Sequence, residues 1–173
     1  MKKWILWTAI LTLAFGSIVN VLTVMAIPVV IMNQLLNKSF KDYAWNTMVH
    51  SSVVTENSRT VVRPSPDLLY SVCKYDISER PLRITVPVPP TYVSVACYDT
   101  NTDNFFHIND REVMNNQIEL VLVKKGSSHP DAGSAVVVEA PTSKGLVLVR
   151  MFIPSEDKLD DLIKAQKQAR CEQ

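Results

Sequence analysis

Residues 61–98, VVRPSPDLLYSVCKYDISERPLRITVPVPPTYVSVACY, decide the fold class of this chain. They contain three short runs rich in β-branched and aromatic residues, at 68–75, 82–86 and 92–98, which is typical of β-strands. The connecting segments DISERP and PVPP hold the Asp, Ser and Pro residues that break strands and form turns. Because these connections are short, we expect a meander in which consecutive strands are neighbours.

Further runs of the same kind continue along the chain, at 117–123, 135–139 and 145–152, with a weaker one near 48–54. No amphipathic helical pattern separates them, which favours an antiparallel β-sandwich or barrel-like domain over βαβ units. After Pro154 the pattern changes to that of a helix, with Ser155 as its cap and basic residues near its end. The chain is therefore predicted to be mainly β, with a β-domain at 61–153 and a C-terminal α-helix at 154–173.

The N-terminus carries a long apolar segment. After Lys2 and Lys3, residues 4–32 run for 29 positions without an ionisable side chain. A helix of that length exceeds the roughly 30 Å hydrocarbon core of a bilayer, whereas a cleaved signal peptide has an apolar core of roughly 7–15 residues. We therefore predict an uncleaved, single-pass transmembrane anchor at 1–36 in contact with membrane lipid, followed by a tether and first weak strand at 37–60. A short basic N-terminus normally stays in the cytoplasm, which places the β-domain on the other side.

Two residues interrupt the apolar segment, Asn20 and Pro28. Proline kinks a helix, and this could simply mark where the helix leaves the bilayer. Alternatively, Asn20 could donate a hydrogen bond to another membrane helix, since polar side chains stabilise helix contacts in lipid. Both residues are therefore candidates for contact with another membrane protein.

Charge excludes one class of partner. Outside the first 36 residues the chain has 16 basic and 17 acidic side chains. Nucleic-acid surfaces need clustered positive charge, so we expect no nucleic-acid partner.

The three cysteines, Cys73, Cys97 and Cys171, do not have the paired spacing of a zinc site. Cys73 and Cys97 could form a disulfide in an oxidising compartment if their strands are neighbours. They could equally be two buried thiols that act as small hydrophobic side chains. In either case Cys171 is left over.

Known catalytic motifs are absent from the sequence: there is no GxSxG, HExxH, Walker loop or dinucleotide fingerprint. The histidines stand far apart, and we expect neither a metal site nor a cofactor. Asp67, Asp76 and Asp99 fall at predicted strand ends, where carboxylates could bind a cation or exchange protons, but where turn chemistry also favours Asp. Asn104 precedes Phe105 and Phe106, one of which must leave the inner face and could line a ligand groove or a protein contact.

Four blocks in order resemble the bacterial domain-of-unknown-function 1254 family. They are Arg63-Pro64-x-Pro66-Asp67-x-x-Tyr70-Ser71, Asp76-x-Ser78-x-x-Pro81-Leu82, Tyr92-x-Ser94 with Tyr98-Asp99-x-x-Thr102, and Gly145-x-Val147-x-Val149-Arg150. The similarity covers about residues 45–153 and is greatest to short forms with one N-terminal membrane helix. It implies a mainly β fold and a companion β-rich domain, numbered 1214, that is a separate protein in short forms. It supplies no catalytic residue set.

Two functional hypotheses follow. The first is a non-enzymatic envelope protein of the bacterial inner membrane, with a periplasmic β-domain that binds a companion 1214-type domain or a larger membrane complex. The second is a hydrolase, or a small-ligand or metal-binding domain, that is active only with a partner. The second hypothesis requires Arg63, Asp67, Tyr70, Asp99 and Arg150 to converge on one pocket.

Overall fold

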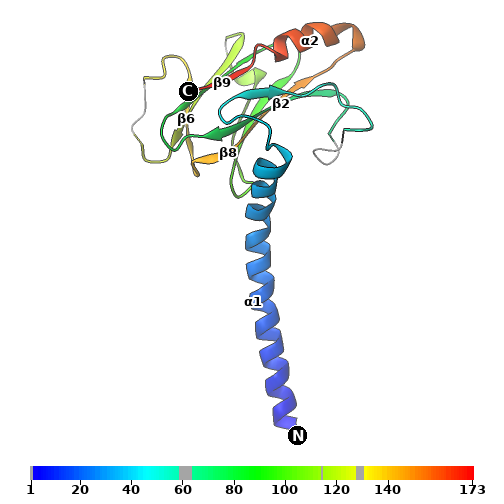
Figure 1. Cartoon of the computed structure of the whole chain (residues 1–173), viewed down its shortest axis with the longest axis vertical. Helices are drawn as coiled ribbons and strands as arrows, with labels where there is room; N and C mark the ends of the chain where they lie inside the picture. Colours follow the sequence, from blue (N-terminus) through cyan, green and yellow to red (C-terminus); the bar gives the residue numbers. More distant parts are fainter. Residues whose placement is uncertain (1, 59–63, 114, 128–130) are drawn as a thin grey trace.

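The computed structural model describes residues 2–58, 64–113, 115–127 and 131–173. A long helix, α1 (Lys2–Gln34), projects from a β-domain, and a π-helical turn, η1 (Leu35–Ser39), joins the two. Figure 1 shows β2 and β8 next to the end of α1, with α2 on the far side of the domain. The apolar side chains along α1 are exposed, so α1 is a candidate membrane anchor or signal sequence by length and composition.

The described strands form two sheets, and the mainly β fold predicted from the sequence is confirmed. The five-stranded sheet has the order β1-β2-β8-β4-β5, and the four-stranded sheet has the order β7-β6-β3-β9. The strands are β1 (Met48–His50), β2 (Leu68–Asp76), β3 (Leu82–Pro87), β4 (Val93–Asp99), β5 (Asn104–Asn109), β6 (Gln117–Lys124), β7 (Val136–Ala140), β8 (Lys144–Phe152) and β9 (Arg170–Glu172). Single-turn 3-10 helices lie at η2 (Asp110–Glu112) and η3 (Glu156–Lys158).

The main core lies between the two sheets. Because side chains alternate along a strand, every second residue of each strand faces inward. The fully buried set includes Tyr75 of β2, Val147 of β8, Ile84 of β3 and Leu120 of β6. The sandwich is therefore held by apolar side chains from both sheets, which is where most of its folding free energy originates.

Strand order differs from the expected meander. Instead of lying beside β2, strand β3 belongs to the other sheet, and β8 separates β2 from β4. The nine residues of β8 pair antiparallel with β2 on one side and β4 on the other. The pairing of β6 with β7 is parallel, so the four-stranded sheet is mixed rather than wholly antiparallel.

The C-terminal segment is also more complex than one helix. Helix α2 spans only Leu159–Gln166, and the chain then returns as β9, which pairs antiparallel with β3. Gln166 is buried, and its side-chain amide donates hydrogen bonds to the carbonyls of Ser51 (3.3 Å) and Tyr70 (2.9 Å). The helix thus closes one end of the sandwich and directs the last residues back into a sheet.

A second apolar cluster lies on the outer face of the five-stranded sheet. Val72, Leu146 and Leu148 point away from the main core and contact Met32 of α1, Leu36 of η1 and Phe40, which follows η1. Met32, Leu36 and Phe40 are each 3% exposed, whereas the rest of α1 is largely exposed. The end of the candidate anchor is therefore packed as part of the β-domain.

Candidate functional site

Lys74 is the most unusual charged side chain in the described part of the chain. It lies in β2, is only 3% exposed, and points to the outer face of the five-stranded sheet where α1 ends. Its Nζ donates hydrogen bonds to the carbonyl oxygens of Phe40 (2.7 Å) and Leu36 (3.4 Å). The last carbonyls of a helix lack intrahelical partners and carry partial negative charge. A buried ammonium at this position donates hydrogen bonds to the carbonyls and neutralises their partial charge. Lys74 thus caps the helix that enters the domain.

The environment of Lys74 is both apolar and aromatic. Its Nζ lies 4.8 Å from the centroid of the Trp45 ring, which also has Lys144 Nζ at 5.2 Å. Burial lowers the pKa of Lys74, and the nearby Asp42 carboxylate opposes that shift in part. The ring face attracts the two cations and shields the pair of hydrogen bonds from water.

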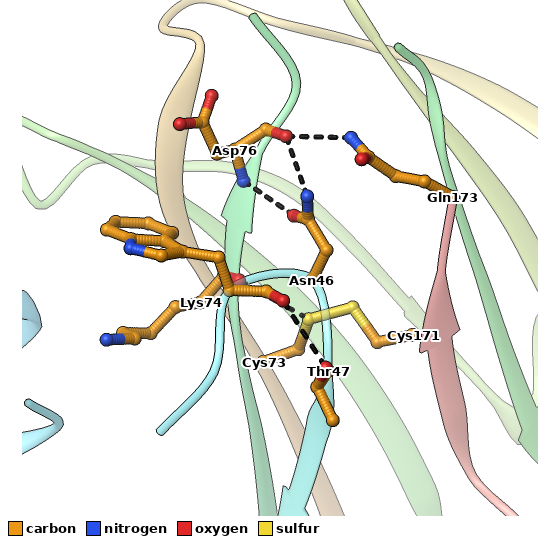
Figure 2. The surroundings of a disulfide bond; sticks show 8 residues. Asn46, Thr47, Cys73, Lys74, Asp76, Cys171 and Gln173 are labelled. Atoms are coloured by element: carbon orange, nitrogen blue, oxygen red, sulfur yellow. Dashed lines mark hydrogen bonds between the residues drawn. A yellow bond between two sulfur atoms is a disulfide. The ribbon is translucent and has the colours of Figure 1, made fainter. Parts of the chain in front are cut away.

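Asn46 fastens the segment after η1 to the end of β2. Its backbone has a φ of 57°, in the left-handed region that Asn tolerates better than most residues. Its side chain donates to the carbonyl of Asp76 (3.0 Å) and accepts from the amide of Asp76 (2.7 Å), as Figure 2 shows. The Asp76 carboxylate in turn pairs with Lys144 Nζ at 3.1 Å.

A disulfide between Cys73 and Cys171 completes this region (Figure 2). It joins β2 in one sheet to β9 in the other, across 98 positions of sequence. Gln173, two residues later, donates hydrogen bonds to the carbonyls of Asp76 and Arg80. The helix end, the edge of β2 and the C-terminus therefore meet in one place, which we call the anchor junction: Trp45, Asn46, Cys73, Lys74, Asp76, Lys144 and Cys171.

The disulfide corrects the expectation that Cys171 is left over, and it excludes the possible pairing of Cys73 with Cys97. Both residues face the core, but each pairs in register with Val147 of β8, which lies between them. Strands are about 4.8 Å apart, so next-but-one strands place the two Cα atoms about 10 Å apart, beyond the reach of a disulfide. Cys97 is a free buried thiol, and burial raises its pKa to about 12.

Tyr70 and Arg150 are brought together, as one of the sequence hypotheses required. They are register partners on β2 and β8. The Tyr70 hydroxyl accepts a hydrogen bond from the backbone amide of Ser65 (2.9 Å), and the Asp67 carbonyl accepts one from Ile153 (2.9 Å). The Asp67 side chain is exposed at the strand end. Arg63 lies outside the described residues.

Asp99 lies at the opposite end of the sheet. It pairs with Gly145, five residues along β8 from Arg150, which corresponds to about 17 Å. Its carboxylate is 6% exposed and accepts hydrogen bonds from the amides of Asn101 (2.8 Å) and Asp103 (3.0 Å). Asp99 therefore organises the turn between β4 and β5, as turn chemistry predicts. Asp99 does not join Tyr70 and Arg150, so the described residues do not assemble the pocket that the second hypothesis requires.

The remaining candidates are separate from one another. Asn104 is exposed at the start of β5, opposite Tyr98, where the β4–β5 register shifts. Asn20 and Pro28 lie on the shaft of α1, outside the part that packs against the domain. Among the residues described, no group of three or more His, Cys, Asp and Glu side chains could hold a metal ion.

Two small hollows lie on the four-stranded sheet. One, of about 170 Å³, is lined by side chains that include Arg83, Val121, Asp131 and Glu172. The second, of about 220 Å³, is lined by residues of the β6 and β7 region, including Glu119 and Val136. Arg83 and Glu119 form an ion pair (3.6 Å) in this region. Both hollows are smaller than the roughly 300–1,000 Å³ of typical small-molecule pockets.

Comparison with known proteins places the chain in a family. The model of one family, described as "Protein of unknown function (DUF1254)", matches residues 45–173. The chain belongs to the DUF1254 family. The matched region begins at Trp45 and includes every residue of the anchor junction, and it confirms the resemblance seen in the sequence blocks. No curated protein matches the chain.

Two solved structures share the fold of this DUF1254 member. The VPA0106 protein from Vibrio parahaemolyticus matches with a TM-score of 0.60 and 12% identity, covering 86% of this chain and 37% of its own. An uncharacterized protein from Burkholderia cenocepacia matches with a TM-score of 0.50 and 15% identity, covering 86% of this chain and 40% of its own. This chain therefore spans less than half the length of either protein.

Proposed function

We propose that this DUF1254 chain is a membrane-anchored envelope protein whose β-domain is a non-enzymatic binding or accessory module. The partner is a companion β-rich domain of the 1214 type or a larger membrane complex. The observation that carries the proposal is the anchor junction, where buried Lys74 binds the carbonyls that end the helix. Such a junction holds the domain in a fixed orientation on α1, which suits a module that must present a surface to a partner.

The same contacts favour an uncleaved anchor over a signal sequence. Met32, Leu36 and Phe40 are buried against Val72, Leu146 and Leu148. Removal of α1 would take Met32 out of this apolar cluster and would leave Leu36 and Phe40, whose carbonyls accept from Lys74, without the helix that holds them in place. Exposure of the apolar side chains that Met32 covers would cost free energy.

The disulfide supports a periplasmic β-domain. Disulfides persist in oxidising compartments and are rare in the cytoplasm. The Cys73–Cys171 bond lies in the β-domain, and Lys2 and Lys3 lie at the other end of α1. The proposed arrangement is a single-pass protein of the bacterial inner membrane with its N-terminus in the cytoplasm.

Binding suits the described residues better than catalysis does. Asp76 pairs with Lys144, and Asp99 accepts two amides of its own turn. Tyr70 has its hydroxyl engaged by a backbone amide. These three candidate side chains are thus occupied by structural contacts.

The outer face of the four-stranded sheet is the proposed partner surface. It lies on the side of the sandwich opposite to the face that α1 covers, so a partner in the periplasm can reach it. It combines the Arg83–Glu119 ion pair with the two hollows. The structural neighbours extend well beyond the part that this chain covers, which supports a need for companion structure.

Purification of the tagged full chain from membranes in mild detergent tests the proposal. We expect a protein partner in stoichiometric amount, retained less well by Arg83→Glu, which reverses a charge on the proposed surface. Lys158→Glu makes the same charge change on η3 and is the matched control. Asn20→Leu removes a polar side chain of α1, so loss of the partner in this variant would indicate a membrane contact of α1 rather than a contact of the domain. A chain that purifies alone from cross-linked and uncross-linked membranes would contradict the proposal.

A further inference from the structure

The outer face of the five-stranded sheet continues beyond the area that α1 covers. Leu146 and Leu148 of β8 contact the end of α1, and by strand alternation Arg150 and Phe152 point to the same side. Phe152 lies four positions after Leu148, which is about 13 Å along the strand. The part of this face under the helix end therefore carries aliphatic side chains, whereas the part beside it carries a cationic and an aromatic side chain, Arg150 and Phe152.

We call this area the Arg150 patch: Tyr92, Ser94, Arg150 and Phe152. Ser94 pairs in register with Arg150, and the Tyr92 carbonyl accepts the amide hydrogen of Phe152 at 2.9 Å, so the four residues are neighbours. Tyr92 and Phe152 are each 40% exposed, although both are large aromatic side chains. Aromatic residues with one wet and one apolar side are enriched where proteins meet the bilayer surface.

The side chains of Arg150 and Ser94 lack partners among the described residues. Within the described ranges, the Arg150 guanidinium makes neither a hydrogen bond nor an ion pair, and its Nε is buried without an acceptor. The Ser94 hydroxyl is likewise buried and unpaired. Asp67 is exposed at the same strand end but forms no ion pair with Arg150 among these residues. Arginine has the planar fork of donors that binds a phosphate through two parallel hydrogen bonds, so an anionic group would complete the site.

The proposed anchor brings the patch close to lipid. The apolar segment ends at Met32, and Met32 is itself buried against the sheet. A 29-residue helix is about 43 Å long, so an upright α1 places the sheet within about 13 Å of the hydrocarbon, and a tilted one brings it closer. Figure 1 shows the sheet next to the end of α1, with β2 and β8 at the end of the helix. The polar headgroup layer fills much of that distance.

We propose that the Arg150 patch rests on the bilayer surface and that Arg150 binds the phosphate of an anionic phospholipid. Tyr92 and Phe152 lie side by side next to Arg150, at the level of the headgroups. This inference rests on the membrane anchoring proposed above, and it adds a second, headgroup-specific contact that orients the domain. Exposed Lys38 and Lys41, just after the helix end, contribute further attraction to an anionic surface.

Photolabelling of the full chain in nanodiscs tests this contact. The discs contain phosphatidylcholine with or without phosphatidylglycerol, plus a lipid with a photoactivatable headgroup, and labelled peptides are mapped by mass spectrometry. We expect labels at residues 91–94 and 149–153, stronger with phosphatidylglycerol. Arg150→Gln should lower that labelling about five-fold, the effect of one arginine near an anionic surface. Arg150→Lys should keep part of it, and Arg83→Gln on the other sheet should leave it unchanged.

Residues 33–41 serve as an internal reference because they directly follow the apolar segment. If they are labelled and the patch is not, the lipid contact is wrong while the anchoring stands. If neither is labelled, the anchoring itself is wrong. Equal labelling of the wild-type patch with and without phosphatidylglycerol would also overturn a phosphate site, and this comparison needs no variant to fold.

Discussion

At the scale of single residues, Lys74 determines how the domain meets its helix. We predict that Lys74→Met destabilises the folded chain by about 1–3 kcal/mol, because the Phe40 carbonyl loses its charged donor in a buried position. Thermal unfolding in detergent and limited proteolysis of residues 35–47 measure this effect. Lys125→Met removes an exposed lysine in a turn and should change neither measurement. Equal protease resistance of Lys74→Met and the wild type would contradict a capping role.

Asp76 makes the anchor junction sensitive to acid. Burial alone would raise its pKa, but hydrogen bonds from Ser78 and Lys144 outweigh burial and lower the pKa below the usual 3.8. A carboxyl with a lowered folded-state pKa contributes stability that is present above pH 3.8 and lost as the pH falls through the folded value.

We therefore expect the free energy of unfolding of the wild type to fall more steeply below about pH 4 than that of Asp76→Asn. Denaturant titrations at a series of pH values measure the two slopes. Asp160→Asn, an exposed position on α2, is the control and should retain the wild-type slope. Parallel curves for wild type and Asp76→Asn would show that the lowered pKa has no effect on stability.

The cysteines give a prediction about which thiols alkylating reagents can modify. The Cys97 thiol is buried with its pKa raised to about 12, so alkylating reagents should not modify the native protein at neutral pH. After unfolding without reductant, peptide mapping should find the label on Cys97 alone. Label on Cys171 under those conditions would restore the Cys73–Cys97 pairing and contradict the structure.

At the scale of elements, β8 determines the order of the five-stranded sheet. Gly145, the second residue of this strand, has no room for a side chain, since a Cβ there would overlap the Tyr98 carbonyl oxygen and the ring of Tyr75. We expect Gly145→Ala to destabilise the domain by about 1–3 kcal/mol through overpacking. Gly16→Ala is the matched control, because a Cβ at Gly16 meets no atom within 4 Å. If Gly145→Ala and the wild type had the same free energy of unfolding, the strand would accommodate the added methyl group without loss of stability, which would contradict this prediction.

The sequence predicted the strands better than their order. Local patterns identify strands such as 68–75, but β8 belongs between β2 and β4 because of long-range pairing that no local pattern encodes. Strand β9 was missed because Arg170–Glu172 follows a helix and has only Cys171 as an inward-facing apolar residue. Strand β5 was missed because its polar residues resemble a loop.

The same limit applies to the site. The sequence singled out Asp67, Tyr70 and Arg150, and only the last two proved to be neighbours across strands. It overlooked Lys74, although a lone lysine inside the apolar run LLYSVCKYD was a usable signal of a buried charge with a specific partner. The partner could not be foreseen, because it is the backbone of a helix end 34 residues away.

At the scale of the whole molecule, the two faces of the sandwich have different proposed roles. The face of the five-stranded sheet is covered by the end of α1 and continues into the Arg150 patch. The face of the four-stranded sheet is free of α1 and carries the proposed partner surface. A rigid anchor junction separates these roles, because it fixes which face turns toward the membrane and which toward the periplasm.

The retention of α1 is tested most directly by the intact mass of the protein extracted from bacterial membranes without reductant. We predict the mass of a chain that still includes residues 2–34, lowered by two hydrogens for the Cys73–Cys171 disulfide. A C-terminal periplasmic reporter on the same chain should be active. A mass that corresponds to a chain starting after α1 would show that the helix is a cleaved signal sequence, and it would contradict a domain that is held on its anchor by Lys74.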